Sequence, residues 1–227
     1  MTARDRSEAG VRPRICFHGI GRPARALEQG EAAYWITPSV LERILDLLDE
    51  QDVDLSFDDG NLSDVEIALP ALQQRGLKAT FFVLAGRLDT AGSLSPEDVR
   101  RLYAAGMKIG THGMNHVPWV GLDRDELHAE TVEARRALAE VTEGRIEDAA
   151  LPLGRYDRRL LGELRKLDYR SVSTSDRRWA KDGAWLQPRF SVRADDSPES
   201  FCRAVLTRRP LASRSLLAAK GVLKRLR

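Results

Sequence analysis

The sequence predicts an α/β fold in which parallel strands alternate with helices in an incomplete or distorted βα barrel. Short runs of β-branched and aromatic residues alternate along the chain with longer amphipathic patterns. This alternation implies right-handed crossovers, which make successive strands parallel. The recognisable units fall short of the eight in a complete barrel. A doubly wound open sheet is therefore the alternative architecture.

The strands are expected where apolar and β-branched residues cluster. These segments are 14–18, 53–57, 79–84, 107–111, 148–153, 169–173 and 186–192. The segment 79–84 is apolar nearly throughout, which is typical of a strand buried on both faces.

The helices are expected between these strands, at 38–50, 63–75, 125–140 and 157–167. Two more begin at Ser-Pro-Glu sequences, at 95–97 and 197–199, where serine serves as the N-cap and proline takes the first helical position. Thr37 and Pro38 give the first helix the same kind of start. Pro70 lies inside the 63–75 pattern, so we expect that helix to be kinked or split.

Composition limits the classes of function. The chain has 227 residues with a formal net charge of +2, which gives no general attraction for nucleic acid. The first 13 residues are polar and lack the apolar core of a signal peptide, and no apolar run is long enough to span a membrane. Two distant cysteines make no disulfide framework. We expect a cytoplasmic protein.

The chain is expected to form one barrel domain at 14–206, followed by a basic helix or tail at 207–227. The tail has seven basic residues and no acidic ones, with leucines and valine on its apolar side. One interpretation is an amphipathic helix that contacts an anionic membrane surface. The other is a closing helix that packs on the barrel with its charges in solvent.

Adjacent carboxylates follow the second strand, in the sequence Ser-Phe-Asp-Asp-Gly at 56–60. Two buried carboxylates repel each other unless a cation lies between or beside them. A divalent metal relieves this repulsion by binding one carboxylate, which leaves the other as a base. Spacing does not decide which of Asp58 and Asp59 has which role. The alternative is a pair of helix-capping residues.

Two histidines follow the fourth strand, in the sequence Thr-His-Gly-Met-Asn-His at 111–116. Imidazoles four residues apart share one face of a helical turn, so His112 and His116 are expected to chelate one ion. Two histidines and one carboxylate leave positions open for water or substrate. Such a site suits hydrolysis of an amide or ester.

Further candidates lie at later strand ends. The turn Leu-Pro-Leu-Gly-Arg-Tyr-Asp at 151–157 can present a backbone N–H to an oxyanion; the alternative is a plain strand-to-helix turn with Asp157 as the helix cap. Trp119 follows the histidine pair, and its ring suits the apolar face of a sugar. Asp176, after the sixth strand, is expected to bind sugar or orient an acid; otherwise it is a turn residue.

These segments together resemble the polysaccharide deacetylase (NodB-like, carbohydrate esterase 4) family. The sequences at 56–60 and 111–116 are similar to its first two motifs, and 151–157 is similar to its third. The resemblance, which spans about 14–195, implies a seven-stranded NodB-type barrel. It also implies that Asp58 is the base that activates water at the metal, and that Asp59, His112 and His116 bind this metal, usually zinc. The backbone N–H of Leu153 is implied to help hold the oxyanion. The implied substrate is an N-acetylated amino sugar of a glycan or glycoconjugate.

The sequence departs from the family pattern in three places. Leu153 replaces the aromatic residue of the third motif, which keeps a backbone donor but changes the pocket wall. The family arginine that precedes the third motif and pairs with the base is replaced by Ala150, and Arg155 and Arg87 are the candidate substitutes. The late histidine that acts as general acid is missing, since no histidine follows His128. His18, at the end of the first strand, is the candidate acid, while His128 is expected on the surface.

Three functions are therefore carried forward. The first is a metal-dependent carbohydrate N-deacetylase. The second is a related barrel that keeps its metal and binds carbohydrate but is catalytically weak or inactive. The third is a hydrolase of another amide or ester.

Overall fold

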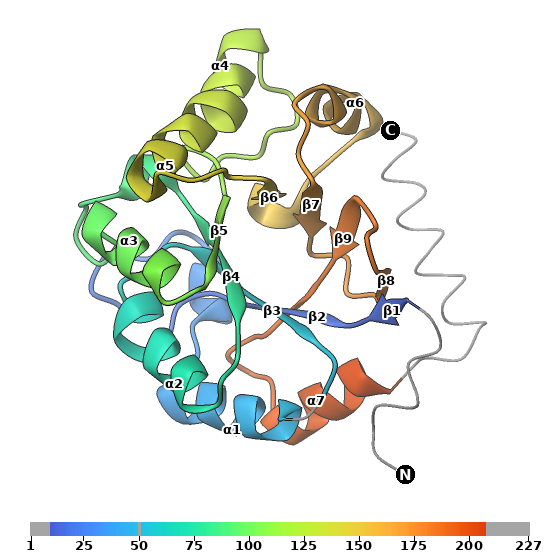
Figure 1. Cartoon of the computed structure of the whole chain (residues 1–227). Coiled ribbons are helices and arrows are strands. Elements are labelled where there is room, and N and C mark those ends of the chain that lie inside the picture. The colour runs from blue at the N-terminus through green and yellow to red at the C-terminus, as the bar shows by residue number, and fades with distance from the viewer. Residues whose placement is uncertain (1–9, 50, 208–227) are drawn as a thin grey trace.

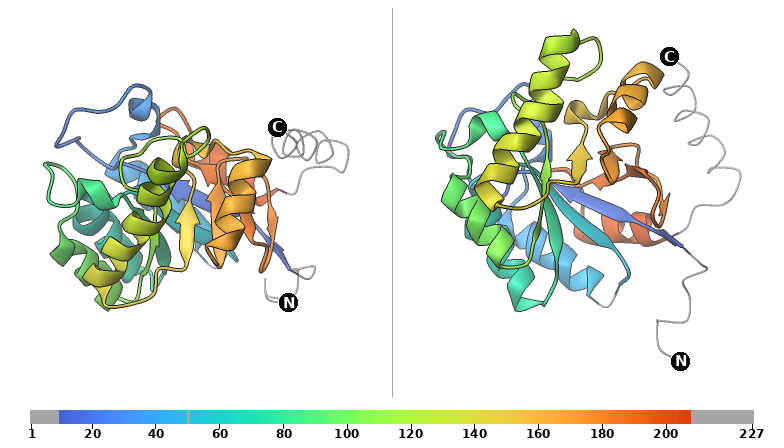
Figure 2. Two further views of the ribbon diagram at one scale, coloured as in Figure 1. Left: turned by 90° about the horizontal axis from the view of Figure 1, so that it is seen from above. Right: turned by 45° about the horizontal axis from the view of Figure 1, so that its top comes forward.

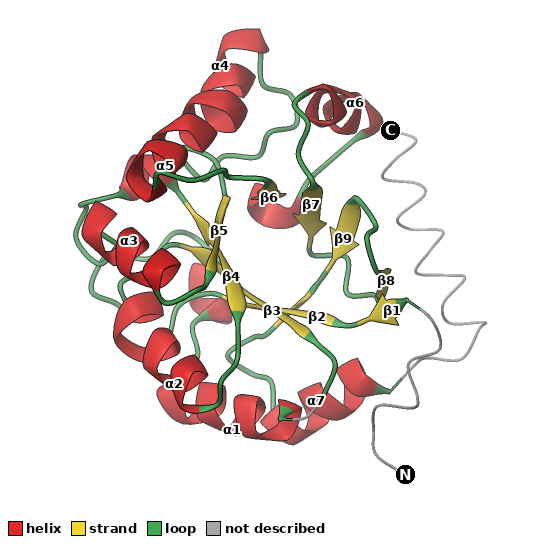
Figure 3. Ribbon diagram, viewed as in Figure 1, coloured by secondary structure: helices red, strands yellow, loops and turns green. Residues whose placement is uncertain are grey.

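The expected strands form one sheet of eight parallel strands. In the computed structural model, which describes residues 10–49 and 51–207, the helices lie around the outside of this sheet (Figures 1 and 3). In spatial order the strands are β10 (Phe190–Ser191), β2 (Arg14–Phe17), β3 (Asp54–Asp59), β4 (Ala79–Val83), β5 (Lys108–Thr111), β6 (Asp148–Ala150), β7 (Ser171–Thr174) and β9 (Leu186–Pro188). A short antiparallel pair, β1 (Val11–Arg12) and β8 (Ala180–Lys181), lies beside it.

The seventh expected strand closes the barrel by changing partners. Its first part, β9, pairs with β7, and its second part, β10, pairs with β2. Only Arg189 separates the two parts. The two edges of the sheet are thus consecutive in the chain, which excludes an open doubly wound sheet. The seven expected strand segments are confirmed, and the sheet is a nearly closed parallel barrel.

Most of the helices begin at the positions that the N-capping residues predicted for them. They are α1 (Pro38–Leu48), α2 (Leu69–Gln74), α3 (Pro96–Ala104), α4 (Arg124–His128), α5 (Ala134–Thr142), α6 (Arg158–Lys166) and α7 (Pro198–Leu206). Short 3₁₀ turns are η2 (Glu31–Tyr34), η4 (Ala85–Arg87) and η6 (Pro152–Gly154). The Thr37 hydroxyl accepts from the Val40 N–H at 3.3 Å, and Ser95 forms a reciprocal capping box with Asp98. Figure 2 shows the helices outside the sheet from two further directions.

Two of the expected helices contain a π-helical turn. The helix at 63–75 is split into η3 (Asp64–Ala68) and α2, because Pro70 lacks the N–H that a regular helix would need there. The helix at 125–140 consists of α4, η5 (Ala129–Glu133) and α5. Wide turns of this kind are frequent near functional sites.

The outward-facing positions of the barrel strands carry apolar residues, whereas several inward-facing positions are polar, which is uncommon for a barrel. Outward-facing rings of Phe17, Phe57 and Phe81 stack with centroids 4.9–5.0 Å apart, in the core beneath the helices. The inward-facing positions of β3 are polar: Asp54, Ser56 and Asp58. Barrel interiors are usually filled by bulky apolar residues. The polar groups here must instead be satisfied by one another or by ligands.

The barrel expected at 14–206 lies within the described residues. The expected basic helix or tail at 207–227 lies outside them, except for Thr207. Among the described helices, none combines the length and apolarity that crossing a membrane requires.

Candidate active site

The paired aspartates lie at the C-terminal end of β3. Asp58 and Asp59 are each 2% exposed. The backbone of Asp59 is left-handed, with φ of 81°, and Gly60 follows with φ of 68°. Left-handed conformations are costly for residues other than glycine and persist mostly at functional sites. This turn allows the carboxylates of two consecutive residues to lie next to each other in one buried site.

The two histidines converge on Asp59. His112 Nε2 lies 3.5 Å from Asp59 Oδ1, and His116 Nε2 lies 3.4 Å from the same oxygen. The predicted convergence is confirmed, but the expected helical turn is wrong. The chain after β5 bends instead, with left-handed φ values of 94° at Gly113 and 57° at His116. A Cβ at Gly113 would lie 2.4 Å from Glu130, so this bend requires glycine.

Each histidine is oriented through its other ring nitrogen. His112 Nδ1 lies 2.9 Å from the carbonyl oxygen of Ala150, and His116 Nδ1 lies 2.6 Å from Glu28 Oε2. Because these oxygens accept hydrogen bonds, we assign the proton to Nδ1 and the lone pair to Nε2 in both rings. Burial lowers the pKa of His112 to about 4, although both nearby aspartates oppose this shift. His112 is therefore neutral at pH 7.

The residues fit a divalent cation. Asp59 Oδ1 is buried without a hydrogen-bond partner, and it faces two imidazole nitrogens that carry lone pairs. One ligand atom from each of the three residues lies within 4.8 Å of the others. A tetrahedral zinc site with bonds near 2.05 Å places its ligands about 3.4 Å apart. The observed 3.4 and 3.5 Å separations agree with that value.

Asp58 is paired with Arg189, which the sequence reasoning missed. Arg189 Nη1 and Nη2 donate to the two carboxylate oxygens at 2.6 and 2.7 Å, and Nη1 also donates to the Ser56 hydroxyl at 2.9 Å. Burial alone would raise the pKa of Asp58, but Arg189 and then His112 hold this pKa well below its usual range. Asp58 is therefore a carboxylate despite its burial.

Neither arginine considered as a substitute has this position. Arg155 is exposed, and Arg87 forms an ion pair with Glu28, the residue that contacts His116. The sequence did contain a signal for Arg189, because it is the one charged residue in the strand segment 186–192. Only the barrel closure brings this position beside Asp58.

His18 lies at the same end of the barrel. It directly follows β2, and one of its ring nitrogens lies within 4.8 Å of both a carboxylate oxygen of Asp58 and the thiol of Cys16. Its Nδ1 is buried without a hydrogen-bond partner, and its ring packs on Tyr34 with centroids 4.9 Å apart. The expected position of His18 at the mouth is thus observed. The other histidine, His128, is on the surface as expected, since its side chain is 56% exposed.

The remaining candidates divide into three groups. Leu153 is in a left-handed turn with φ of 55°, and its side chain is 54% exposed. Asp176 accepts hydrogen bonds from the Tyr156 hydroxyl at 2.6 Å and the Thr174 hydroxyl at 3.0 Å, so it is not a simple turn residue. The expectation for Trp119 is wrong, because its ring is 1% exposed in a second apolar cluster and offers no face to a sugar.

Glu130, like Arg189 and Glu28, is a residue that the sequence reasoning missed. Although only 2% exposed, it accepts hydrogen bonds from the backbone N–H groups of Met114 and Asn115, at 2.7 and 3.1 Å. The Asn115 amide and the Trp119 indole also donate to it. Glu130 lies in the π-helical turn η5 and holds the loop between the two histidines.

Comparisons with known proteins agree with this geometry. A family model for polysaccharide deacetylases matches residues 48–172. A chitooligosaccharide deacetylase from Bradyrhizobium sp. (strain ANU 289) is 30% identical over 142 residues, which cover 61% of this chain and 63% of that protein. YxkH of Bacillus subtilis (strain 168) is 24% identical over 127 residues, which cover 56% of this chain and 46% of that protein. The chain therefore matches less than two-thirds of the length of either relative.

Solved structures share the fold. The deacetylase PplD of Streptococcus pyogenes, in complex with acetate, superposes with a TM-score of 0.75 at 20% identity, covering 86% of this chain and 98% of that one. IcaB of Ammonifex degensii superposes with a TM-score of 0.69 at 20% identity, covering 87% and 97%. The family model covers more than half of this chain, and its first two motifs form the buried cluster described above. The protein is a member of the polysaccharide deacetylase family.

Proposed function

We propose that the protein is a metal-dependent hydrolase that removes the N-acetyl group from an amino sugar of a glycan or glycoconjugate. The observation that carries this proposal is the convergence of Asp59, His112 and His116 beside the ionised carboxylate of Asp58. The 30% identity to a chitooligosaccharide deacetylase supports the substrate class.

Asp59, His112 and His116 would hold the cation, for which nitrogen and carboxylate ligands favour zinc. A divalent metal supplies Lewis acidity, which lowers the pKa of water and polarises an acetyl carbonyl. Glu28 and the Ala150 carbonyl keep the two imidazoles in the ligating tautomer.

Asp58 is the proposed base. It would accept a proton from the attacking water, whose oxygen forms the new bond to the acetyl carbon. Arg189 orients this carboxylate with two hydrogen bonds and keeps it ionised before the reaction. His18 is the proposed donor of the proton that the departing sugar amine needs, because it lies near Asp58 at the mouth. The Leu153 N–H remains the proposed donor to the oxyanion.

The pairing of Arg189 with Asp58 favours an active enzyme over a binding-only relative. The missing arginine before the third motif was a main reason to consider an inactive barrel. Arg189, between β9 and β10, supplies an equivalent guanidinium group, so this reason no longer applies.

The test is metal analysis combined with acetate release from N-acetylated chitooligosaccharides. Wild-type protein should bind one zinc and release acetate, whereas Asp58→Asn should keep zinc and lose activity. His112→Ala should lose the metal, because it removes one of three protein ligands. Lys166→Gln, which removes an exposed charge on α6 that belongs to no part of the proposed site, serves as the control.

Specific outcomes would contradict the proposal. Equal zinc content in wild type and His112→Ala would refute the ligand assignment. Unchanged acetate release by Asp58→Asn would refute the assigned base. If acetylated sugars are inert while other amides or esters are hydrolysed, the substrate class is wrong and the metal site is right.

A further inference from the structure

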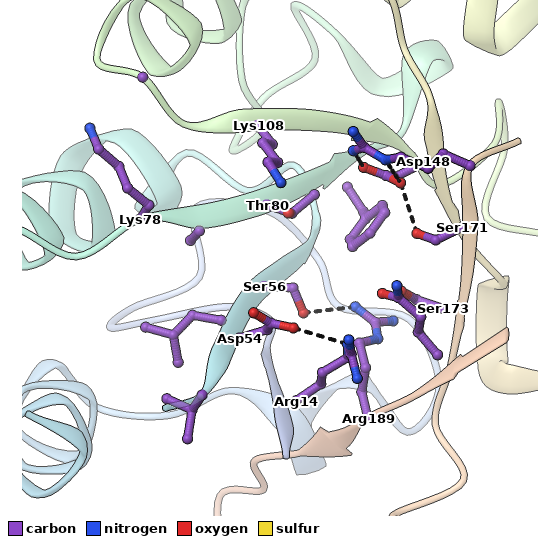
Figure 4. Close-up of a pocket in the computed structure, with 17 residues that line it drawn as sticks. Arg14, Asp54, Ser56, Lys78, Thr80, Lys108, Asp148, Ser171, Ser173 and Arg189 are labelled. Atoms are coloured by element: carbon purple, nitrogen blue, oxygen red, sulfur yellow. Dashed lines mark hydrogen bonds and ion pairs between the residues drawn. The ribbon is translucent and has the colours of Figure 1, made fainter. Parts of the chain in front are cut away.

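A cavity lies at the opposite end of the barrel from the candidate active site. Its volume is about 520 Å³. It is lined by the first residues of five strands, namely Arg14, Asp54, Lys108, Asp148 and Ser171. The proposed metal ligands lie at the carboxyl ends of β3 and β5, and none of them lines this cavity. Figure 4 shows this cavity with its polar lining.

The strand register explains why this cavity is polar. Cys16, Ser56, Thr80 and Lys108 occupy paired positions on four adjacent strands and face the same side of the sheet. The last three of these line the cavity together with Ser173 and Gln187. Hydroxyl, amide and ammonium groups therefore replace the apolar layer that would normally fill a barrel interior. Such groups need hydrogen-bond partners.

Two buried guanidinium groups leave donors unused here. Arg14 is 6% exposed, and its Nη1 makes no hydrogen bond. Arg189 is 4% exposed, and its Nε makes none, although its two Nη atoms hold Asp58. Figure 4 shows both side chains on one side of the cavity, with Thr80 and Lys108 on another. Burial lowers the pKa of Arg14, which reflects incomplete compensation of its charge.

The acidic groups of the lining are already compensated. Asp148 pairs with Arg170 and accepts from the Ser171 hydroxyl at 2.8 Å. Asp54 lies 3.1 Å from Arg14 Nε and 3.6 Å from Arg12 Nη1. Lys108 has no ion-pair partner among the described residues. The cavity therefore has a surplus of cationic donors and no free carboxylate to repel an anion.

We propose that this cavity binds the phosphoryl group of a small phosphorylated molecule. Guanidinium N–H groups and an ammonium group match the several acceptor oxygens of a phosphate, and the serine and threonine hydroxyls add neutral donors. The volume lies within the range of about 300–1,000 Å³ that is usual for small-molecule pockets. It leaves room for an organic body attached to the phosphate. This site shares Arg189 with the candidate active site, but its proposed ligand takes no part in the proposed deacetylation.

Calorimetric titration of the metal-free full chain tests the proposal. The probes are inorganic phosphate and glucose 6-phosphate, with glucose as the uncharged comparison, in a buffer without phosphate or sulfate. Both phosphates should bind to wild type, and glucose should not. Arg14→Gln should weaken binding by about ten-fold or more, the effect of losing a charge-assisted hydrogen bond. Lys108→Gln should also weaken it.

Two control variants make the result specific. Lys166→Gln removes an exposed charge on α6 that is not part of the lining, and it should leave binding unchanged. His112→Ala alters the candidate metal site and should also leave binding unchanged. If Arg14→Gln does not fold, Lys108→Gln decides, because its side chain is exposed and unpaired.

Three results would overturn the proposal. Wild type binding neither phosphate would mean that the cavity holds only hydrated ion pairs. Equal losses in Lys108→Gln and Lys166→Gln would indicate non-specific attraction to surface charge. Loss of binding in His112→Ala would place the anion at the candidate metal site.

Discussion

Replacing Arg189 with glutamine should strongly destabilise the protein. Arg189 and Asp58 are 4% and 2% exposed and share two hydrogen bonds of 2.6 and 2.7 Å. Removing one partner of such a buried pair leaves the other charge uncompensated, which costs about 3–5 kcal/mol. For a domain of this size, a loss of about 3 kcal/mol lowers Tm by roughly 6–12 °C.

The assay is thermal and urea unfolding of metal-free protein, so that bound cation does not contribute to stability. Arg155→Gln is the control and should change stability by less than about 0.5 kcal/mol, since Arg155 is exposed. The double variant Arg189→Gln/Asp58→Asn removes both charges. Its free energy of unfolding should be higher by about 1–3 kcal/mol than the value obtained by adding the losses of the two single variants.

Two results would refute this reasoning. If Arg189→Gln unfolds within about 2 °C of wild type, loss of the arginine does not leave Asp58 as a costly buried charge. If the two single losses add fully in the double variant, Arg189 and Asp58 are not energetically coupled.

Three other predictions follow from contacts of the site and core. Glu28→Gln removes the charge that orients His116, so zinc affinity should fall about 10–100-fold in a chelator competition; unchanged affinity would exclude this role. Trp119→Ala should lower stability by about 3–5 kcal/mol in urea unfolding, since the ring is 1% exposed; a change in substrate KM without loss of stability would restore the sugar-contact interpretation. Burial raises the pKa of the Cys202 thiol to about 11 and the pKa of the Cys16 thiol well above its usual range. A thiol reagent at pH 8 should therefore label neither cysteine rapidly until the protein is unfolded, and fast labelling of native protein would contradict their burial.

Local sequence patterns predicted most of the fold. Helix starts at Thr37 and Ser95 were predictable because a capping side chain contacts a backbone group only three residues away. The strand segments were predictable because apolar residues mark the face that packs beneath the helices. The π-helical turn at Ala129–Glu133 was not, since nothing in its local pattern distinguishes it from a regular helix.

The candidate site was predicted only in part, for a similar reason. Asp58, Asp59, His112 and His116 belong to short motifs at strand ends, and parallel strands bring such ends together. Glu28 and Glu130 were missed because each contacts the histidine loop from a separate segment. Trp119 was assigned to the substrate because sequence does not distinguish a buried ring from an exposed one.

By itself, the sequence determined the parallel βα architecture, the carboxylate pair and the histidine pair, because each depends on neighbours within a few residues. The tertiary structure alone decided which arginine meets Asp58. Arg189 lies 131 residues away in the chain and reaches this carboxylate because the last strand segment changes partners and closes the barrel. Such a contact depends on the order and register of strands, which no local pattern of residues specifies.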